Sequence, residues 1–382
     1  MSYLEYTTSR VPTGWRKILH VNWALVVLLA AVASYGFVML YSIAGGSLMP
    51  WTDPQMKRFA LGLVLMLGIG FTPLWVWRSI AGIAYLVSLL LLLGVEFFGT
   101  IGMGARRWLV IGPIRLQPSE LAKITTILAL AAYYDWLGLK KVSHPLWVGL
   151  GAAIALVPAL LVLRQPDLGT AMLLAAGGGI VIWAAGVHWA YFAVLFGSFA
   201  AGISAVMMSR GTEWQILKDY QYRRIDAFMD PSIDPLGAGY HINQSMIALG
   251  SGGWSGRGFM EGTQARLNFL PEKHTDFIFT TLAEEFGFVG AASLLVLYLM
   301  ILGFCLLIAL RTTSRFGALL VIGVAGTFFL YFAVNMAMVM GLAPVVGVPL
   351  PLVSYGGSAM IVVMAGFGLV QSAHIHRPRL PV

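Results

Sequence analysis

Long apolar runs separated by short polar segments make up most of the chain. A helix needs about 20 predominantly apolar residues to cross a bilayer. Runs close to that length occur at residues 22–43, 59–77, 79–97, 119–137, 145–163, 169–187, 189–208, 276–310, 317–341 and 352–373. The pattern therefore predicts an all-α polytopic integral membrane protein, a bundle of about ten transmembrane helices.

Two stretches of this pattern contain residues that break helices. The run 276–310 is longer than one span requires, and Gly287 and Gly290 mark where we expect it to bend. The segment PVVGVPLPLVSYGGS, residues 344–358, combines three prolines and paired glycines with the polar Ser354. Such backbone at membrane depth must line a cavity or pack on protein. Broken helices also occur in transporters, so this segment does not separate an enzyme from a carrier.

Residues 209–275 are predicted to form one large loop that contains a short interfacial helix. Within HINQSMIALG, residues 241–250, four residues share one helical face: Ile242, Ser245, Met246 and Leu249. Gly250 and Gly252 are expected to end this helix. No repeat or second domain is visible, so residues 1–382 are predicted to form a single membrane domain.

The composition agrees with a membrane protein and narrows its partners. Of the 382 residues, 59% are hydrophobic and 10% are charged, whereas a soluble protein has about 25% charged residues. The net charge of +8 is not carried by a compact basic domain. Nucleic acid is therefore not an expected partner, while an anionic lipid surface or an anionic lipid substrate suits the charge. The only cysteine, Cys305, excludes an intrachain disulfide.

Basic residues are divided unequally between the two sets of short loops. The loops on the N-terminal side hold Arg10, Arg16, Lys17, Arg78, Lys140, Lys141, Arg311, Arg315, Arg377 and Arg379. The opposite loops hold Lys57, Arg58, Arg106, Arg107, Arg115 and Arg164. The positive-inside rule then places both termini in the cytoplasm and residues 209–275 outside it. The first run is too long for a cleaved signal peptide, so we expect it to be an uncleaved span.

Asp276 lies where the large loop enters the apolar run 276–310. An ionisable group at the edge of a membrane bundle is a functional candidate by default. As a general base, Asp276 would accept a proton from a sugar hydroxyl. Alternatively, Thr275 or Asp276 only caps the helix N-terminus. His274 is either a second titrating group or a solvated loop residue.

Two polar clusters upstream are candidates for the same site. In RLQPSELAK, residues 115–123, Glu120 and Lys123 are spaced i, i+3 and are expected to pair. The pair is either structural, at the bilayer edge, or lines the cavity that Asp276 faces. Arg106 and Arg107 supply guanidinium forks suited to pyrophosphate, or anchor the chain at the interface.

RQPDLGT, residues 164–170, places Arg164 and Asp167 on a tight external loop. Asp167 either caps the next helix through Thr170, the interpretation that we favour, or contributes to the polar cavity. The stretch GSGGWSGRG, residues 250–258, resembles a phosphate loop only in composition. The sequence contains no Walker motif, HExxH or Gly-x-Ser-x-Gly, which disfavours an ATP-driven transporter or an intramembrane metalloprotease.

Five segments together resemble the SEDS family of bacterial cell-wall polymerases, and within it the RodA branch more than the FtsW branch. They are RRWLVIGPIRLQPSELAK (106–123), RQPDLGT (164–170), DPLGAGYHINQSMIALGSGG (234–253), GTQARLNFLPEKHTDFIFTTLAEE (262–285) and PVVGVPLPLVSYGGS (344–358). They extend from the loop after the third run to the last run, so the resemblance covers most of the chain. Any one alone is suggestive, whereas the five in this order are highly specific.

The resemblance implies a peptidoglycan glycosyltransferase with ten transmembrane helices in the bacterial inner membrane. It would polymerise lipid II into β-1,4-linked glycan strands for cell elongation and rod shape. Its partners would be a class B penicillin-binding protein, the nascent glycan strand and other elongation-complex proteins. The proposed catalytic aspartate of the family falls on Asp276, and its cavity-lining positions fall on Glu120, Lys123 and Asp167.

In that reaction Asp276 would deprotonate the acceptor 4-hydroxyl, which attacks the donor anomeric carbon with inversion. Undecaprenyl pyrophosphate would leave, so no nucleotide site is needed. Basic side chains would offset the charge on the pyrophosphate: Arg106, Arg107, Lys123 or Arg164. A divalent cation, Mg²⁺ or Mn²⁺, could share this role through Glu120 or Asp167, which the sequence does not decide. The alternatives are a lipid II flippase and a non-catalytic scaffold of the elongation complex.

Overall fold

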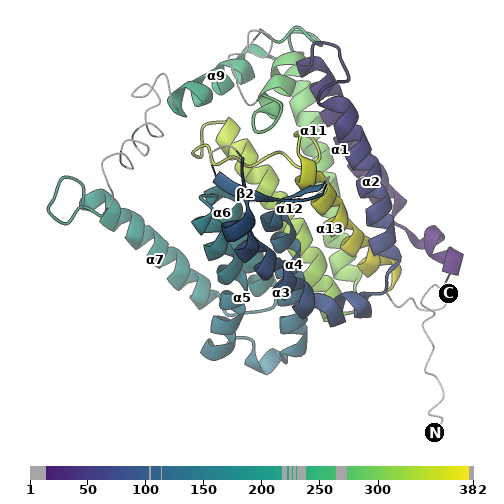
Figure 1. Ribbon diagram of the computed structural model, residues 1–382, viewed down its shortest axis with the longest axis vertical. Coiled ribbons are helices and arrows are strands. Elements are labelled where there is room, and N and C mark those ends of the chain that lie inside the picture. Colours follow the sequence, from purple (N-terminus) through teal and green to yellow (C-terminus); the bar gives the residue numbers. More distant parts are fainter. Residues whose placement is uncertain are drawn as a thin grey trace.

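Figure 1 shows the computed structural model of the chain, which describes residues 14–102, 105–112, 114–216, 222, 226, 229, 238–263 and 273–377. Its long helices are α1 (Trp23–Ile43), α2 (Thr52–Phe71), α3 (Leu74–Phe98), α4 (Pro118–Trp136), α5 (Pro145–Arg164), α6 (Leu168–Ala184), α7 (Trp189–Met208), α11 (Ile278–Arg311), α12 (Arg315–Val339) and α13 (Gly357–Ile375). Each overlaps one predicted run, so the helical membrane fold is confirmed.

Seven helices in the described part of the chain are long and apolar enough to cross a membrane: α1, α3, α5, α7, α11, α12 and α13. The other three fall short for physical reasons. The first two turns of α2 carry charged residues, α4 contains Glu120 and Lys123, and α6 has only 17 residues. Polar or short helices of this kind need protein neighbours inside a bilayer. In the described part of the chain, α2, α4 and α6 are therefore covered by neighbouring helices, whereas α7 buries none of its residues and projects away from the bundle (Figure 1).

Side chains at the helix ends explain where several helices begin. The Asn22 side chain accepts a hydrogen bond from Leu25 N at the start of α1. Ser314 caps α12 through Gly317 N in the same way. Pro118 occupies the first position of α4, where its missing N–H costs no helical hydrogen bond. Pro118 is therefore well suited to begin α4.

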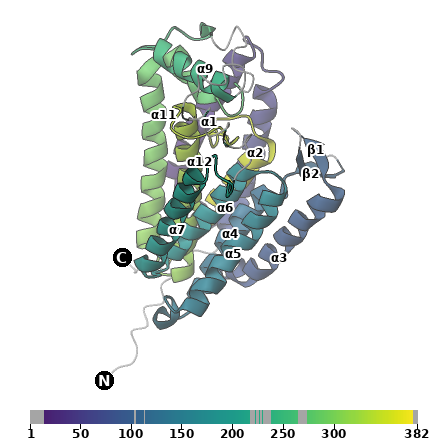
Figure 2. The same ribbon diagram turned by 90° about the vertical axis from the view of Figure 1, so that its left-hand side faces the viewer.

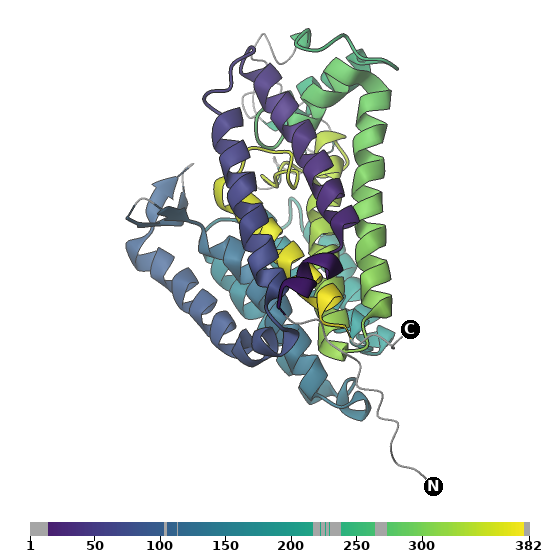
Figure 3. The same ribbon diagram turned by 90° about the vertical axis from the view of Figure 1, so that its right-hand side faces the viewer.

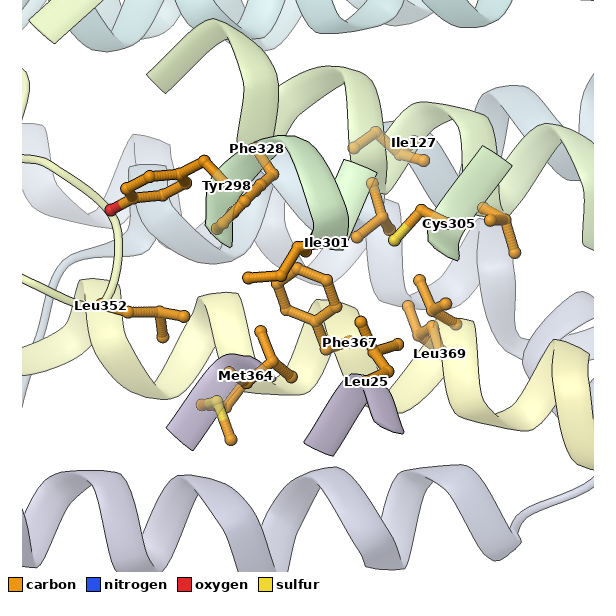
Figure 4. Close-up of a cluster of buried hydrophobic side chains, with 14 of the residues drawn as sticks. Leu25, Ile127, Tyr298, Ile301, Cys305, Phe328, Leu352, Met364, Phe367 and Leu369 are labelled. Carbon is orange, nitrogen blue, oxygen red and sulfur yellow. The ribbon is translucent and has the colours of Figure 1, made fainter. Parts of the chain in front are cut away.

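The core lies where α1, α4, α11, α12 and α13 meet (Figure 4). Ile127, Phe328 and Phe367 there are at most 3% exposed, and Cys305 is fully buried. Gly323 allows α12 to approach α4, since a Cβ at that position would lie 2.4 Å from Ile127 Cγ2. Small residues at contacts of this kind are the usual packing device of membrane helices.

The predicted bend in the eighth run is confirmed at Gly287. This residue has φ 64° and ψ −161°, so α11 consists of two helical parts separated by one left-handed residue. Gly290, the other candidate, lies within the second part. Because a bend leaves backbone groups without helical partners, other segments must satisfy them.

Residues 252–258 provide those partners, and we call this segment the glycine brace. Phe288 N donates to Gly253 O at 2.9 Å, and Arg257 N donates to Glu284 O at 2.9 Å. Gly256 lies so close to the bend that a Cβ would be 2.1 Å from Glu285 O. The Gly-rich stretch that resembles a phosphate loop in composition is therefore a backbone support for α11.

The loop between α3 and α4 forms a small antiparallel sheet, which the all-helical prediction did not include (Figure 2). Its strands, in the order β1-β2-β3, are Thr100–Gly102, Ala105–Ile111 and Ile114–Leu116. The run Arg106–Ile111 is rich in β-forming residues but too short to span a membrane. Gly112, with φ +61°, occupies the turn that brings Leu109 opposite Leu116.

The short helix expected in the large loop is α9 (Ala238–Ser251), which packs against α11 (Figure 2). On the predicted face, Ile242 and Ser245 are buried, Leu249 is half-buried and Met246 is 42% exposed. Ser245 Oγ donates to Val339 O at 2.7 Å, which joins α9 to the end of α12. The helix extends through Gly250 and ends before Gly252. Much of the rest of the loop lies outside the described residues.

Candidate active site

Asp276 lies in the turn formed by residues 273–277, directly before α11. The N-cap of α11 is Phe277, which makes no side-chain cap hydrogen bond. Asp276 and Thr275 therefore lie one and two residues before the N-cap position. The Asp276 carboxylate faces Gly347, where a Cβ would lie 3.7 Å from Oδ2.

Asn335 on α12 holds this turn against the interrupted segment, which we define as residues 344–356. Its Nδ2 donates to Asp276 O at 2.9 Å and to Val348 O at 2.7 Å. Asn335 is fully buried. One amide group thus fixes the backbone of Asp276 and the interrupted segment to the same helix.

Ser354 makes a second connection between the turn and the interrupted segment. Its Oγ donates to Thr275 O at 2.6 Å and accepts from Leu350 N at 2.8 Å. Tyr355 N donates to His274 O at 2.9 Å. The interrupted segment therefore packs on protein, as predicted, and it also lines a cavity of about 10 Å³. Thr275 and His274 are held through their backbone oxygens, so the position of the neighbouring Asp276 is determined by the fold.

His274 contacts two aromatic rings, so a solvated loop histidine does not describe it. Its ring stacks on Trp51 with 4.9 Å between centroids and an interplanar angle of 21°. The centroid of the Tyr355 ring lies 6.1 Å from that of His274. Trp51 is the N-cap residue of α2, so the N-terminal end of α2 meets the turn that carries Asp276.

Glu120 and Lys123 form the predicted pair, with 2.6 Å between Lys123 Nζ and Glu120 Oε1. They are 5% and 3% exposed, so the pair lies inside the bundle rather than at its edge. Tyr331 donates its hydroxyl to Glu120 Oε2 at 3.1 Å, and Lys123 Nζ lies 4.3 Å from the Tyr331 ring centroid. These contacts offset part of the cost of burying two charges.

The pair and Asp276 are linked through one face of α12. The pair lines a cavity of about 40 Å³ whose other walls are largely apolar side chains of α4, α12 and α13. Tyr331 contacts the pair, and Asn335 contacts Asp276 one helical turn later. One turn advances a helix by about 5.4 Å, so the two polar clusters occupy neighbouring levels of the bundle.

Asp167 caps α6, as we favoured, by accepting a hydrogen bond from Thr170 N at 3.1 Å. Its other oxygen, Oδ2, lies 3.8 Å from Arg107 Nη1. A Cβ on Gly169, in the first turn of α6, would lie 2.5 Å from Val346 O. Asp167 and Arg107 therefore lie near the interrupted segment, where α6 meets it.

Arg106 and Arg164 are exposed, and within the described residues neither forms an ion pair. The structure therefore separates the four predicted basic groups. Lys123 is buried in the bundle and Arg107 lies beside Asp167, while Arg106 and Arg164 remain at the surface. A role for the last two in binding an anion stays a prediction.

The carboxylates suggested for a divalent cation already have other partners. Glu120 accepts hydrogen bonds from Lys123 and Tyr331, and Asp167 caps a helix beside Arg107. Among the described residues, no group of three or more His, Cys, Asp or Glu side chains is placed to hold a metal ion. This donor set does not fit a metal site, and the mechanism below uses none.

Several polar residues at this end of the bundle were missed by the sequence analysis: Gln55, Arg58, Tyr331 and Asn335. Gln55 is fully buried, and its Nε2 donates to Ser354 O at 2.9 Å. All four are polar residues within or beside an apolar run, which is the signal that could have identified them. Gln55 and Arg58 are spaced i, i+3, and Tyr331 and Asn335 are spaced i, i+4, so each pair lies on one helical face.

Comparison with known proteins gives one family for almost the whole chain. The model FTSW_RODA_SPOVE, described as cell cycle protein, matches residues 20–379. Peptidoglycan glycosyltransferase MrdB of Escherichia coli (strain K12) is 43% identical over 370 residues, which cover 96% of this chain and 97% of MrdB.

Solved structures resemble the fold as well. A chain from a study of how a peptidoglycan synthase complex coordinates polymerization and crosslinking matches with a TM-score of 0.79 and 34% identity, over 93% of this chain and 97% of that chain. The rod shape determining protein RodA of Thermus thermophilus matches with a TM-score of 0.69 and 31% identity, over 94% and 98%.

Proposed function

The chain belongs to the FTSW_RODA_SPOVE family of cell cycle proteins, and from that premise we propose how its site works. It is an integral membrane peptidoglycan glycosyltransferase, the activity for which MrdB is named. We infer that residues 1–382 act as a single membrane domain that polymerises lipid II into glycan strands, with Asp276 as the general base.

The proposed step is an inverting displacement. The acceptor 4-hydroxyl oxygen forms a bond to the donor anomeric carbon and gives its proton to Asp276. The bond from the anomeric carbon to the diphosphate oxygen breaks, and undecaprenyl diphosphate leaves with the electron pair. A positioned base typically contributes about 10²–10⁴-fold to such a rate.

One observation carries this assignment to Asp276. The turn that bears it is held by Asn335 and Ser354, which donate hydrogen bonds to the backbone oxygens of Asp276 and Thr275. A carboxylate held in this way at the mouth of a bundle is preorganised for proton transfer. Glu120 and Lys123 are proposed to line the inner part of the same site, one turn further along α12.

The membrane orientation and the partners are also proposals. The distribution of basic residues supports cytoplasmic termini, with Asp276 on the outer face of the bacterial inner membrane. The relative from a peptidoglycan synthase complex supports a class B penicillin-binding protein as partner, in cell elongation and rod shape. The names of the relatives favour an enzyme over a flippase or a scaffold.

Asp276→Asn tests the base directly. The full chain, reconstituted with its cognate penicillin-binding protein, should lose at least about 100-fold of its glycan polymerisation from lipid II. The matched control is Asp53→Asn, which removes a carboxylate that pairs with the exposed Lys57 on α2. That variant should keep activity close to that of the wild type.

The penicillin-binding protein alone must give no polymer, so that the product is assigned to this chain. Size-exclusion and thermal unfolding profiles should show that Asp276→Asn remains folded. Polymerisation by Asp276→Asn at a rate near that of Asp53→Asn would exclude Asp276 as the base.

A further inference from the structure

Arg58 lies on the face of α2 that meets the interrupted segment and α13. Its Cζ lies 4.7 Å from the centroid of the Tyr355 ring. The centroid of the same ring lies 6.1 Å from that of His274, which is two residues before Asp276. The guanidinium is therefore at the same end of the bundle as the proposed base.

The charge of Arg58 has no counter-charge in the part of the chain that the structure describes. No carboxylate there forms an ion pair with Arg58, and its buried Nη1 has no hydrogen-bond partner. A charged donor that is buried without a partner is destabilising, so a bound anion would stabilise it. The neighbouring Lys57 differs in both respects, since it is 76% exposed and pairs with Asp53 at 2.7 Å.

The first turn of α13 faces the same guanidinium. A Cβ on Gly357, the first residue of α13, would lie 3.9 Å from Arg58 Cζ and 4.0 Å from Nη2. No side chain caps this helix at Gly356. Peptide N–H groups at a helix start favour an anion, as does a guanidinium fork. The guanidinium of Arg58 and the N–H groups of the first turn of α13 would therefore favour an anion in the same place.

We propose that Arg58, assisted by the first turn of α13, binds a phosphate group of the lipid-linked diphosphate that the enzyme uses or releases. The inference rests on the proposed function, because it takes the ligand class from that reaction. The guanidinium supplies the charge and the hydrogen-bond donors, and Tyr355 holds its plane. This position is separate from the four basic residues considered from the sequence alone.

The test measures binding without turnover. Full-length protein in phosphatidylcholine nanodiscs is titrated with undecaprenyl diphosphate, and with undecaprenol as the uncharged probe. Arg58→Ala should weaken diphosphate binding by about tenfold or more, the loss expected for one charge-assisted contact. Lys57→Ala should change it by less than about twofold. Binding of undecaprenol should be the same in all three proteins.

A second variant tests the site without removing Arg58. Gly357→Asp places a carboxylate beside the guanidinium at a helix start, where acidic residues are stabilising. It should abolish the preference for diphosphate over undecaprenol, whereas Gly357→Ala, which adds only a methyl group, should retain it. If Arg58→Ala does not fold, the comparison of Gly357→Asp with Gly357→Ala tests the proposal instead.

Three outcomes would overturn the proposal. Wild-type diphosphate affinity in both Arg58→Ala and Gly357→Asp would exclude an anion site. An equal loss of undecaprenol binding would show that Arg58 acts only by packing. Full displacement of diphosphate by phosphatidylglycerol in the discs would assign the site to a phospholipid headgroup.

Asp276→Asn separates this inference from the proposed function. It should bind undecaprenyl diphosphate like the wild type while failing to polymerise lipid II. If the wild type also makes no polymer but its diphosphate binding still depends on Arg58, the proposed reaction fails and the anion site stands.

Discussion

The amide of Asn335 shows how one side chain can hold a functional residue without touching its functional group. It bonds the backbone oxygens of Asp276 and Val348, and its own Oδ1 is buried without a partner among the described residues. A buried acceptor of this kind costs about 1–3 kcal/mol. The amide is retained at this cost because it joins three parts of the chain.

Asn335→Leu keeps a similar side-chain volume but leaves the two carbonyl oxygens without their donor. We expect a loss of about 1–3 kcal/mol in unfolding free energy and a fall in glycan polymerisation, measured by thermal unfolding and by lipid II turnover. Thr281→Val is the control, because the buried Thr281 hydroxyl has no hydrogen-bond partner among the residues that the structure describes. If both variants behave alike, Asn335 does not position Asp276.

The sequence offers candidate residues for the site, whose roles stay predictions, but not the long-range contacts between them. Asp276, Glu120, Lys123 and Asp167 are charged residues at the ends of apolar runs. The sequence could not show that Asn335 bonds Asp276, because their contact joins positions 59 residues apart. Pairings across that separation depend on how helices pack, which local patterns do not encode.

At the scale of elements, the glycine brace explains why α11 breaks where it does. The bend at Gly287 and the close approach of Gly256 depend on each other, since a Cβ on Gly287 would lie 2.3 Å from Gly256 N. Apolar run length predicted the helices, and glycine spacing predicted the bend. Neither predicted which segment would form hydrogen bonds with the backbone groups that the bend exposes.

Gly256→Ala should destabilise the fold by at least about 1–2 kcal/mol, because its φ of +82° disfavours a side chain and a methyl group would strike Glu285 O. Gly250→Ala is the matched control within the same stretch. No atom lies within 4 Å of its added Cβ, and its helical position favours alanine. Equal thermal unfolding temperatures for the two variants would refute the brace.

Element types were also predicted unevenly. The sheet after α3 was not predicted, because a pattern of membrane spans does not reveal strands and residues 105–111 are too few to form a span. Their aromatic and β-branched character was visible in the sequence. A strand prediction there needed only the turn at Gly112 to be considered.

At the scale of the whole molecule, His376 links stability to pH at the end of α13. Burial lowers the pKa of His376 below its usual 6.5, and Lys17 lowers it further, while Ser372 O opposes the shift. The unfolded chain therefore binds a proton more readily than the folded one. Unfolding free energy should fall as pH drops below about 6.5 and through the lowered pKa.

His376→Gln should flatten this dependence in thermal unfolding measured between about pH 5 and 7. His144→Gln, at an exposed histidine before α5, should leave it as in the wild type. An unchanged pH profile in His376→Gln would show that other groups determine the dependence.

The last helix of the bundle packs against the N-terminal part of the chain, which has a consequence for biogenesis. α13 lies along α2 (Figure 3), and Asn22 and Gln371 exchange two hydrogen bonds across 349 positions. During synthesis α2 reaches the membrane long before α13 leaves the ribosome. Until then Gln55 lacks its partner at Ser354 O. The polar α2 must therefore remain without its final neighbour until α13 has been synthesised. Packing of the bundle cannot be completed helix by helix in the order of the chain.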